Sequence, residues 1–344
     1  MVSGGRSKHG GINDGDHILA GLALAATATQ AAISIETVSV GDWGNAADPT
    51  TGYGAVGYSY NIGKYEVTIG QYTAFLNAVA ATDTYSLYNT SMGTDLNVAG
   101  ISRSGSPGSY TYAVKVNAGQ DMTNRPITYV SWFDAARFSN WMANGQTTGA
   151  QGNATTENGA YTLNGATSGV GFTKNVTNPN TGQVVNWWIP SENEWYKAAY
   201  YSPGVSTDSY WLYPTQSDSA PENTIGSGAN QANYWIGGYS TGSAPYITNG
   251  GAYSASGSHY GTFDQGGNVW EWNDAVISGY YRGLRGGCWD YGSLQSSLRN
   301  NYSPGFGDST MGFRVASVPE PSAAVLVMLS GAGWLVWKRR RVTL

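Results

Sequence analysis

The stretch that decides the fold is GTFDQGGNVWEWNDAV at residues 261–276, followed by RGLRGGCWDYGSLQSSLRNNYSPGFGDSTMGFRVA at residues 282–316. Its second half is framed by RGG at residues 285–287 and GFR at residues 312–314. This segment is too long for a hairpin and too poor in charge for a disordered tail. Loops held between two anchors commonly carry the site of a protein. We therefore expect the upstream chain to be the scaffold of this loop.

The first half of the stretch combines two carboxylates with a tight glycine turn. Asp264, the pair Gly266 and Gly267, Asn268 and Glu271 lie within a few residues of one another. Hard oxygen ligands on a glycine turn suit calcium. The alternative is a turn whose aspartate and asparagine bond their own backbone while the neighbouring tryptophans fill the core. Spacing alone leaves both interpretations open.

Further sequence blocks carry a resemblance to a known family. GNVWEW, RGGCW and GFR in the stretch are preceded by GKYEVTIGQYTAFLN at 63–77, NRPITYVSWFDAARFSNWM at 124–142 and IPSENEWYKAAYY at 189–201. In this order the blocks resemble the formylglycine-generating enzyme family, also called the sulfatase-modifying factor family. The resemblance implies an α+β, C-type-lectin-like fold that is irregular and loop-rich, with short helices and twisted antiparallel strands.

The resemblance also implies which atoms would form the calcium site. The matching turn of the family carries calcium, so the expected ligands are the carboxylates of Asp264 and Glu271 and the backbone carbonyls of Gly267 and Val269. Such a calcium ion would stabilise the fold, because extracellular calcium is abundant enough to fill weak sites.

Composition favours one large domain over two small ones. The chain has 344 residues, 41% of them hydrophobic and 13% aromatic, which suffices for a sizeable core. With 48 glycines, 25 tyrosines and only 11% charged residues, the fold should be loop-rich and held by aromatic packing. The formal charge of −5 and the lack of a basic stripe before the C-terminus argue against a nucleic-acid partner. The single cysteine excludes an internal disulfide.

The chain before residue 261 contains three signals for the start of a helix. Thr68 with Gln71 and Ser191 with Glu194 have the spacing of capping boxes, and a third helix opens at Ser131 after a proline. In that third helix Ala135, Phe138, Trp141 and Met142 are expected on one side, and Asp134 is expected to be a dipole partner at the helix start. Residues 81–122 and 145–183 are predicted to be loop-rich insertions, the first of them exposed. Residues 202–260 are predicted to be turns with scattered aromatic anchors, Tyr234, Trp235 and Tyr239.

The two ends of the chain predict export. Residues 1–32 end in an apolar, alanine-rich stretch typical of an export leader, with a short buried helix as the alternative. Residues 33–317 are predicted to form the domain. Residues 318–344 resemble a PEP-CTERM sorting tail, with VPEP, an apolar run at 322–337 and a basic end. That run spans roughly 24 Å as a helix, short against a hydrocarbon core of about 30 Å.

These ends define the expected location and partners. The protein is expected in the bacterial cell envelope or extracellular matrix, held at least transiently in the membrane by residues 322–341, because basic residues remain on the cytoplasmic side. The tail would be recognised by a sorting machinery.

This sequence lacks residues that the enzymes of the resembled family use for catalysis. Its formylglycine-forming members use two cysteines in the loop after RGGSW, which bind copper as thiolates. In this sequence those positions fall near Tyr291 and Ser296, and Cys288 replaces the serine of RGGSW. One thiolate cannot supply a two-sulfur site for soft Cu(I), so copper is not expected. Cys288 as a nucleophile would need a cationic neighbour, for which Arg285 is the candidate; a small thiol packed beneath the loop is the alternative.

A second branch of the superfamily, the sulfoxide synthases of ergothioneine pathways, holds non-haem iron with three histidines. Here His9 and His17 lie in or before the predicted leader, which leaves only His259. A histidine facial triad cannot be built from one residue.

These observations favour a ligand-binding or interaction module whose loop meets an envelope protein or glycan. Aromatic area and adaptable hydrogen-bonding groups are typical of recognition surfaces. The residues expected to bind are Trp289, Asp290, Tyr291, Ser293, Ser296, Asn300, Asn301 and Tyr302. Two alternatives stay open: a merely solvated loop, and a divergent metal-dependent oxidoreductase that uses Cys288 or another transfer reaction that uses Asp290 or Glu271.

Overall fold

The computed structural model describes residues 32–204 and 209–319. Residues 1–31 of the predicted leader, the apolar run and the basic tail lie outside these residues. Within the described part of the chain, no helix combines the length and the apolar character that a bilayer crossing requires.

Two four-stranded sheets form the framework. The first joins β1 (Thr37–Val40), β2 (Tyr60–Gly63), β12 (Ala316–Ser317) and β7 (Trp187–Trp188) in that order, so the first and last strands share one sheet. The second has the order β10 (Asn300–Tyr302), β9 (Tyr281–Arg285), β8 (Trp270–Ile277), β11 (Met311–Gly312). All strand pairs in these sheets are antiparallel, as predicted, except β11 with β8.

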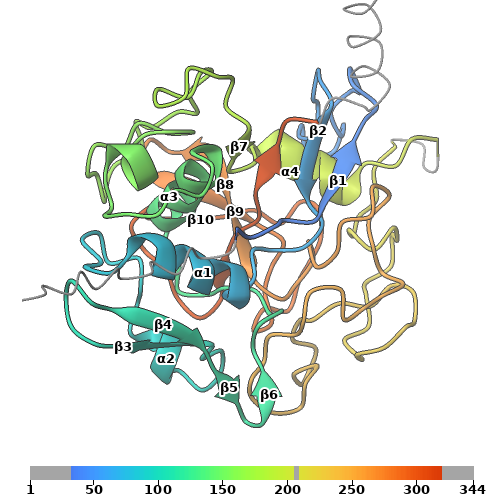
Figure 1. The fold of residues 1–344 in the computed structure, drawn as a ribbon. Helices are drawn as coiled ribbons and strands as arrows, with labels where there is room; N and C mark the ends of the chain where they lie inside the picture. The colour runs from blue at the N-terminus through green and yellow to red at the C-terminus, as the bar shows by residue number, and fades with distance from the viewer. Residues whose placement is uncertain (1–31, 205–208, 320–344) are drawn as a thin grey trace, which may run out of the picture. The chain divides into compact units, whose positions relative to one another are not determined.

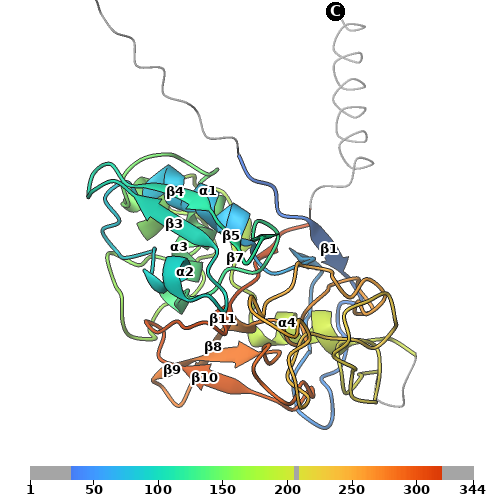
Figure 2. The same ribbon diagram turned by 90° about the horizontal axis from the view of Figure 1, so that it is seen from below.

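Smaller elements surround these sheets. The pairs β3 (Ile101–Ser104) with β4 (Thr111–Val114) and β5 (Val116–Asn117) with β6 (Gln120–Asp121) are two-stranded. The helices are α1 (Ile69–Val79), α2 (Ser91–Thr94), α3 (Trp132–Ala143), α4 (Glu192–Tyr200) and the π-helical turn Asn153–Glu157. Figure 1 shows α1 and α3 side by side, and Figure 2 shows the β3–β4 pair above the second sheet.

Local sequence signals set the helix starts. Thr68, Ser131 and Ser191 each accept a hydrogen bond from the backbone N–H of the third helical residue, whose side chain accepts one in return. In α3 the reciprocating residue is Asp134, so this acid closes the helix start, in keeping with the predicted structural role. The hydrogen bonds at a helix start join residues only three positions apart, and for this reason the spacing in the sequence predicted them.

One expectation about exposure was wrong and another was incomplete. The residues expected on one side of α3 are buried, and the rest of the helix is buried as well, because the segment of residues 145–183 packs on its outer face. The segment of residues 81–122 is not a wholly exposed insertion. It contributes Leu87, Met92, Ile101 and Tyr112 to the core, and β4 packs on α1.

The decisive stretch ties this core together. Phe313 packs edge-on against Phe138 of α3, whose ring in turn meets Phe75 of α1. The next residue, Arg314, is fully buried and forms a two-point ion pair with Glu271 of β8, with N–O distances of 2.5 and 2.6 Å. Its remaining N–H groups donate to the carbonyls of Gly63 and Phe263.

Breaking this ion pair should be costly. We expect Arg314→Met to lower the free energy of unfolding by about 3–5 kcal/mol, because it leaves the buried Glu271 carboxylate without its counterion. Glu36→Gln is the matched control: it removes the exposed ion pair with Lys64 and should cost at most about 1 kcal/mol. Urea unfolding followed by tryptophan fluorescence measures both, and equal small losses would contradict the central role of Arg314.

Candidate functional site

One carboxylate binds both ends of the loop of residues 286–299 that follows β9. Glu192, the first residue of α4, accepts from Arg285 Nε at 2.8 Å and from Arg299 Nε and Nη2 at 2.8 and 2.7 Å. Arg285 also donates to the backbone carbonyls of Ser296 and Leu298, at 2.8 and 2.9 Å. The first and last parts of the loop are therefore bound to the same helix start.

A buried tryptophan fixes the middle of the loop. The Trp289 indole stacks on Tyr246 with ring centroids 5.0 Å apart, and its Nε1–H donates to the Ser309 carbonyl at 3.1 Å. Its backbone N–H donates to the carbonyl of Asn268 at 3.0 Å. With Trp289 turned inward, the next two residues, Asp290 and Tyr291, face solvent.

Around these two residues lies a small aromatic surface. Tyr291 is 43% exposed and Trp235 is 44% exposed, and the Trp235 N–H donates to the Tyr291 carbonyl. The Tyr239 hydroxyl donates to Asp290 Oδ1 at 3.0 Å. We call Trp235, Tyr239, Asp290 and Tyr291 the loop face.

The structure divides the residues that the sequence predicted as a binding loop. Trp289 and Ser296 are buried, so they support the loop and do not face a ligand at the surface. Asn300, Asn301 and Tyr302 form strand β10 against β9, where Tyr302 stacks on Phe306. Only Asp290, Tyr291 and the half-buried Ser293 lie in the turn beside Trp289.

Sequence reasoning did not place Trp235 and Tyr239 at the site. Both were expected to be anchors in a turn region; Tyr239 does pack against Tyr246 and Trp289, and its hydroxyl also donates to Asp290, whereas Trp235 is exposed. The available signal was the flexible context, because Trp235 precedes Ile236, Gly237 and Gly238.

Cys288 lies beneath the loop. Its side chain is buried, and burial raises the pKa of its thiol to about 12, with the carboxylates of Asp290 and Asp308 adding to the shift. Arg285, the predicted activating cation, directs its guanidinium to Glu192 and to loop carbonyls. A single protonated thiol with the buried Ser296 hydroxyl does not fit the paired thiolates that copper needs.

This environment predicts an unreactive thiol. In native protein at pH 8, we expect iodoacetamide to label Cys288 far more slowly than in protein unfolded in urea, because the thiolate is the reactive form. Mass spectrometry of timed samples gives both rates. Native labelling at the unfolded rate would show that the thiol is exposed and ionised.

The two carboxylates expected to bind calcium are engaged in other interactions. Both Glu271 oxygens accept from Arg314, and Oε2 also accepts from Trp195 Nε1 at 2.7 Å. Asp264 Oδ2 accepts from the N–H of Gly251 at 2.6 Å. As placed, this set does not fit a calcium ion, and among the described residues no group of three or more His, Cys, Asp or Glu is arranged to hold a metal. Calcium binding by Asp264, Gly267, Val269 and Glu271 stays a prediction that requires Glu271 to release Arg314.

Of the three histidines considered as iron ligands, the structure describes one. His259 is exposed and packs its ring edge against Tyr260, with centroids 5.0 Å apart. His9 and His17 lie outside the described residues.

Comparison with known proteins supplies the family context. Residues 35–318 match the family model described as a sulfatase-modifying factor enzyme 1-like domain, which confirms the predicted fold class. No curated protein matches the chain.

Similar solved structures span most of the chain. They include CarF (21% identity, 83% of this chain and 99% of that one, TM-score 0.49) and Treponema denticola variable protein 1 (19%, 85% and 98%, 0.46). PvdO from Pseudomonas aeruginosa is also similar (16%, 83% and 92%, 0.42). At these identities and scores the similarities carry no functional argument.

Proposed function

Because the chain belongs to the sulfatase-modifying factor enzyme 1-like family, we propose that it uses this fold as a ligand-binding module and not for formylglycine synthesis. The observation that carries the proposal is the clamp of Glu192 on Arg285 and Arg299. It holds a loop whose exposed turn displays Tyr291 and Asp290 above a buried, protonated thiol.

The loop face has the properties of a preorganised recognition surface. Trp289 is locked by stacking and a hydrogen bond, so the adjacent turn loses little conformational entropy when a ligand binds. Tyr291 and Trp235 supply rigid aromatic area, and Asp290 supplies a hydrogen-bond acceptor already oriented by Tyr239. Aromatic faces beside a carboxylate suit a sugar ring with its hydroxyls, so an envelope glycan is the first ligand class to test, followed by an envelope protein.

The competing function is a divergent oxidoreductase of the formylglycine-generating type. It would depend on Cys288 alone, because the chain has one cysteine. Asp290 has no acid/base partner among its described contacts beyond Tyr239, and Glu271 is occupied by Arg314. Copper-dependent oxygen consumption with cysteine-containing peptides, abolished by Cys288→Ser, would overturn the binding proposal.

The binding face can be tested with three single substitutions. Tyr291→Ala should weaken capture of envelope glycans about tenfold without lowering stability, because it removes an exposed aromatic contact. Trp289→Ala should instead destabilise the fold by about 3–5 kcal/mol, since it opens a cavity beneath the loop. Tyr280→Ala is the matched control, because this exposed tyrosine lies at the opposite end of the β8–β9 hairpin.

Glycan arrays identify the ligand, and biolayer interferometry then compares the variants. Equal affinities for Tyr291→Ala and Tyr280→Ala would contradict the proposal. A screen in which only envelope proteins bind would transfer it to a protein ligand at the same face.

The location is a separate proposal. The leader-like residues 1–32 and the sorting-type tail at 318–344 support an exported envelope protein that is at least transiently anchored at its C-terminus. Cells expressing the full chain or a chain truncated after Ala316 should differ on fractionation, with the membrane fraction reduced in the truncated form. Equal cytosolic recovery of both chains would refute the location.

A further inference from the structure

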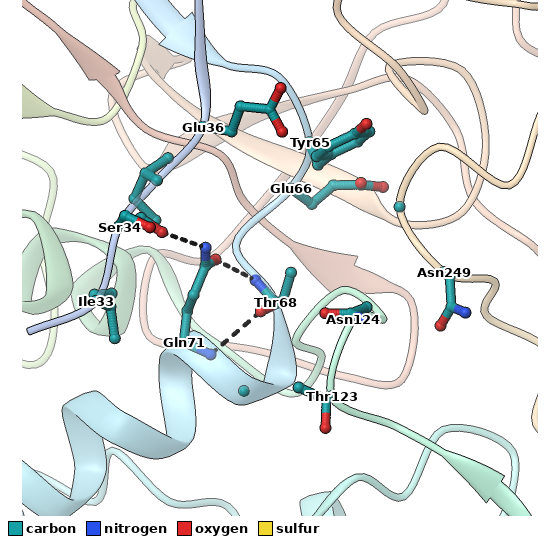
Figure 3. A pocket seen from close by; sticks show the side chains of 13 residues that line it. Ile33, Ser34, Glu36, Tyr65, Glu66, Thr68, Gln71, Thr123, Asn124 and Asn249 are labelled. Atoms are coloured by element: carbon teal, nitrogen blue, oxygen red, sulfur yellow. Dashed lines mark hydrogen bonds between the residues drawn. The ribbon is translucent and has the colours of Figure 1, made fainter. Parts of the chain in front are cut away.

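A cavity of about 620 Å³ with both polar and apolar walls lies at the start of α1. The segment of residues 33–36, the turn at Tyr65 and Glu66, and the segments around Asn124 and Asn249 line it (Figure 3). Hydrogen bonds fix these walls. Gln71 Nε2 donates to the Ser34 carbonyl at 3.0 Å, and the Gly250 N–H donates to the Asn124 carbonyl at 2.9 Å. The cavity is therefore preformed.

One carboxylate in its wall is incompletely paired. Glu66 is only 3% exposed, and its Oε1 accepts from Asn268 Nδ2 at 3.2 Å, whereas its buried Oε2 has no hydrogen-bond partner. In Figure 3 the carboxylate points toward the Asn249 segment across the cavity. An unsatisfied buried carboxylate oxygen carries a large desolvation penalty, so this position requires a donor or a cation.

The surrounding charge favours a cation. The described residues that line the cavity include Glu66 and Glu36 but no Lys, Arg or His. Lys64, which is not among the lining residues, is paired with Glu36 at 2.8 Å. Behind Glu66, Arg314 is engaged by Glu271. Burial and the neighbouring Asp264 raise the pKa of Glu66, the charge of Arg314 opposes this only in part, and a cation in the cavity would offset the remainder.

The walls favour an organic cation over a bare metal ion. The cavity is much larger than one ion, and no group of three metal-ligating side chains is present among the described residues. Tyr65 offers an aromatic wall, Ile33 and Ile35 offer apolar contacts, and Asn124 and Asn249 line the polar side. An ammonium group with an alkyl stem matches these features, because its N–H groups satisfy a carboxylate while its stem covers apolar surface.

We propose that this cavity binds a primary alkylammonium group, with Glu66 Oε2 as its counterion. The ammonium is either that of a free amine or that of a lysine side chain. The site is independent of the ligand-binding function proposed for the loop face.

The test is titration calorimetry of the full chain with n-butylammonium chloride. 1-Butanol is the neutral probe of similar shape, and sodium chloride controls for ionic strength. Butylammonium should bind, and Glu66→Gln, which removes the charge but keeps the shape, should weaken binding at least about tenfold. Glu222→Gln is the matched control and should retain the affinity, because Glu222 is exposed and does not line the cavity.

Two further binding measurements are needed, one with a second variant and one with a second ligand. Ser34→Phe changes an exposed wall residue and should also reduce binding by narrowing the cavity, which tests the site even if Glu66→Gln fails to fold. Nα-acetyl-lysine amide separates the sources: tighter binding than butylammonium indicates a lysine side chain, and weaker binding indicates a free amine. Binding of 1-butanol equal to that of butylammonium, or affinities unchanged by both Glu66→Gln and Ser34→Phe, would overturn the proposal.

Discussion

The ion pair between Arg314 and Glu271 is the contact on which the architecture depends. Glu271 lies on β8 of the second sheet, and Arg314 lies between β11 and β12, two strands of different sheets. The same guanidinium donates to the carbonyl of Gly63 at the end of β2. One buried cation therefore joins the two sheets, and its geometry is satisfied only when both are in place. Desolvation offsets much of the attraction in a buried pair of this kind, but removal of one partner leaves an uncompensated buried charge.

Other buried arginines also donate hydrogen bonds to backbone carbonyls while they pair with a carboxylate. A fold with short strands and long loops leaves many backbone carbonyls without a strand or helix partner, and buried carbonyls need donors. Here arginines supply them while a carboxylate balances the charge. The donors and accepting carbonyls are Arg137 to Ala166, Arg282 to Val170 and Asp274, Arg285 to Ser296 and Leu298, and Arg314 to Gly63 and Phe263. This use explains how a chain with only 11% charged residues places several of them in its interior.

Features set by interactions between residues close together in the sequence could be predicted, and features set by contacts between distant segments could not. The helix starts at Thr68, Ser131 and Ser191 are local, and the fold class was carried by ordered sequence blocks. The all-round burial of α3 depends on residues that follow it in the chain, so periodicity within the helix could not show it. The loop face likewise needs Trp235 beside Tyr291, a contact between segments more than fifty residues apart. No sequence pattern distinguishes Glu66 from other acidic residues, and only tertiary packing leaves its Oε2 without a hydrogen-bond partner.

Asn268 connects the two proposed sites and bears on whether they communicate. Its side-chain amide donates to Glu66 at the cavity, and its carbonyl accepts from Trp289 beneath the loop face. Its Oδ1 accepts from Thr248, in the segment that carries Tyr246 at one end and lines the cavity at the other. Contact alone does not transmit binding, because coupling needs an element with two arrangements that each ligand favours differently. Asn268 is fully buried and bonded on every side, which is the character of a rigid support. The two sites are therefore expected to bind independently, sharing a scaffold and not a switch.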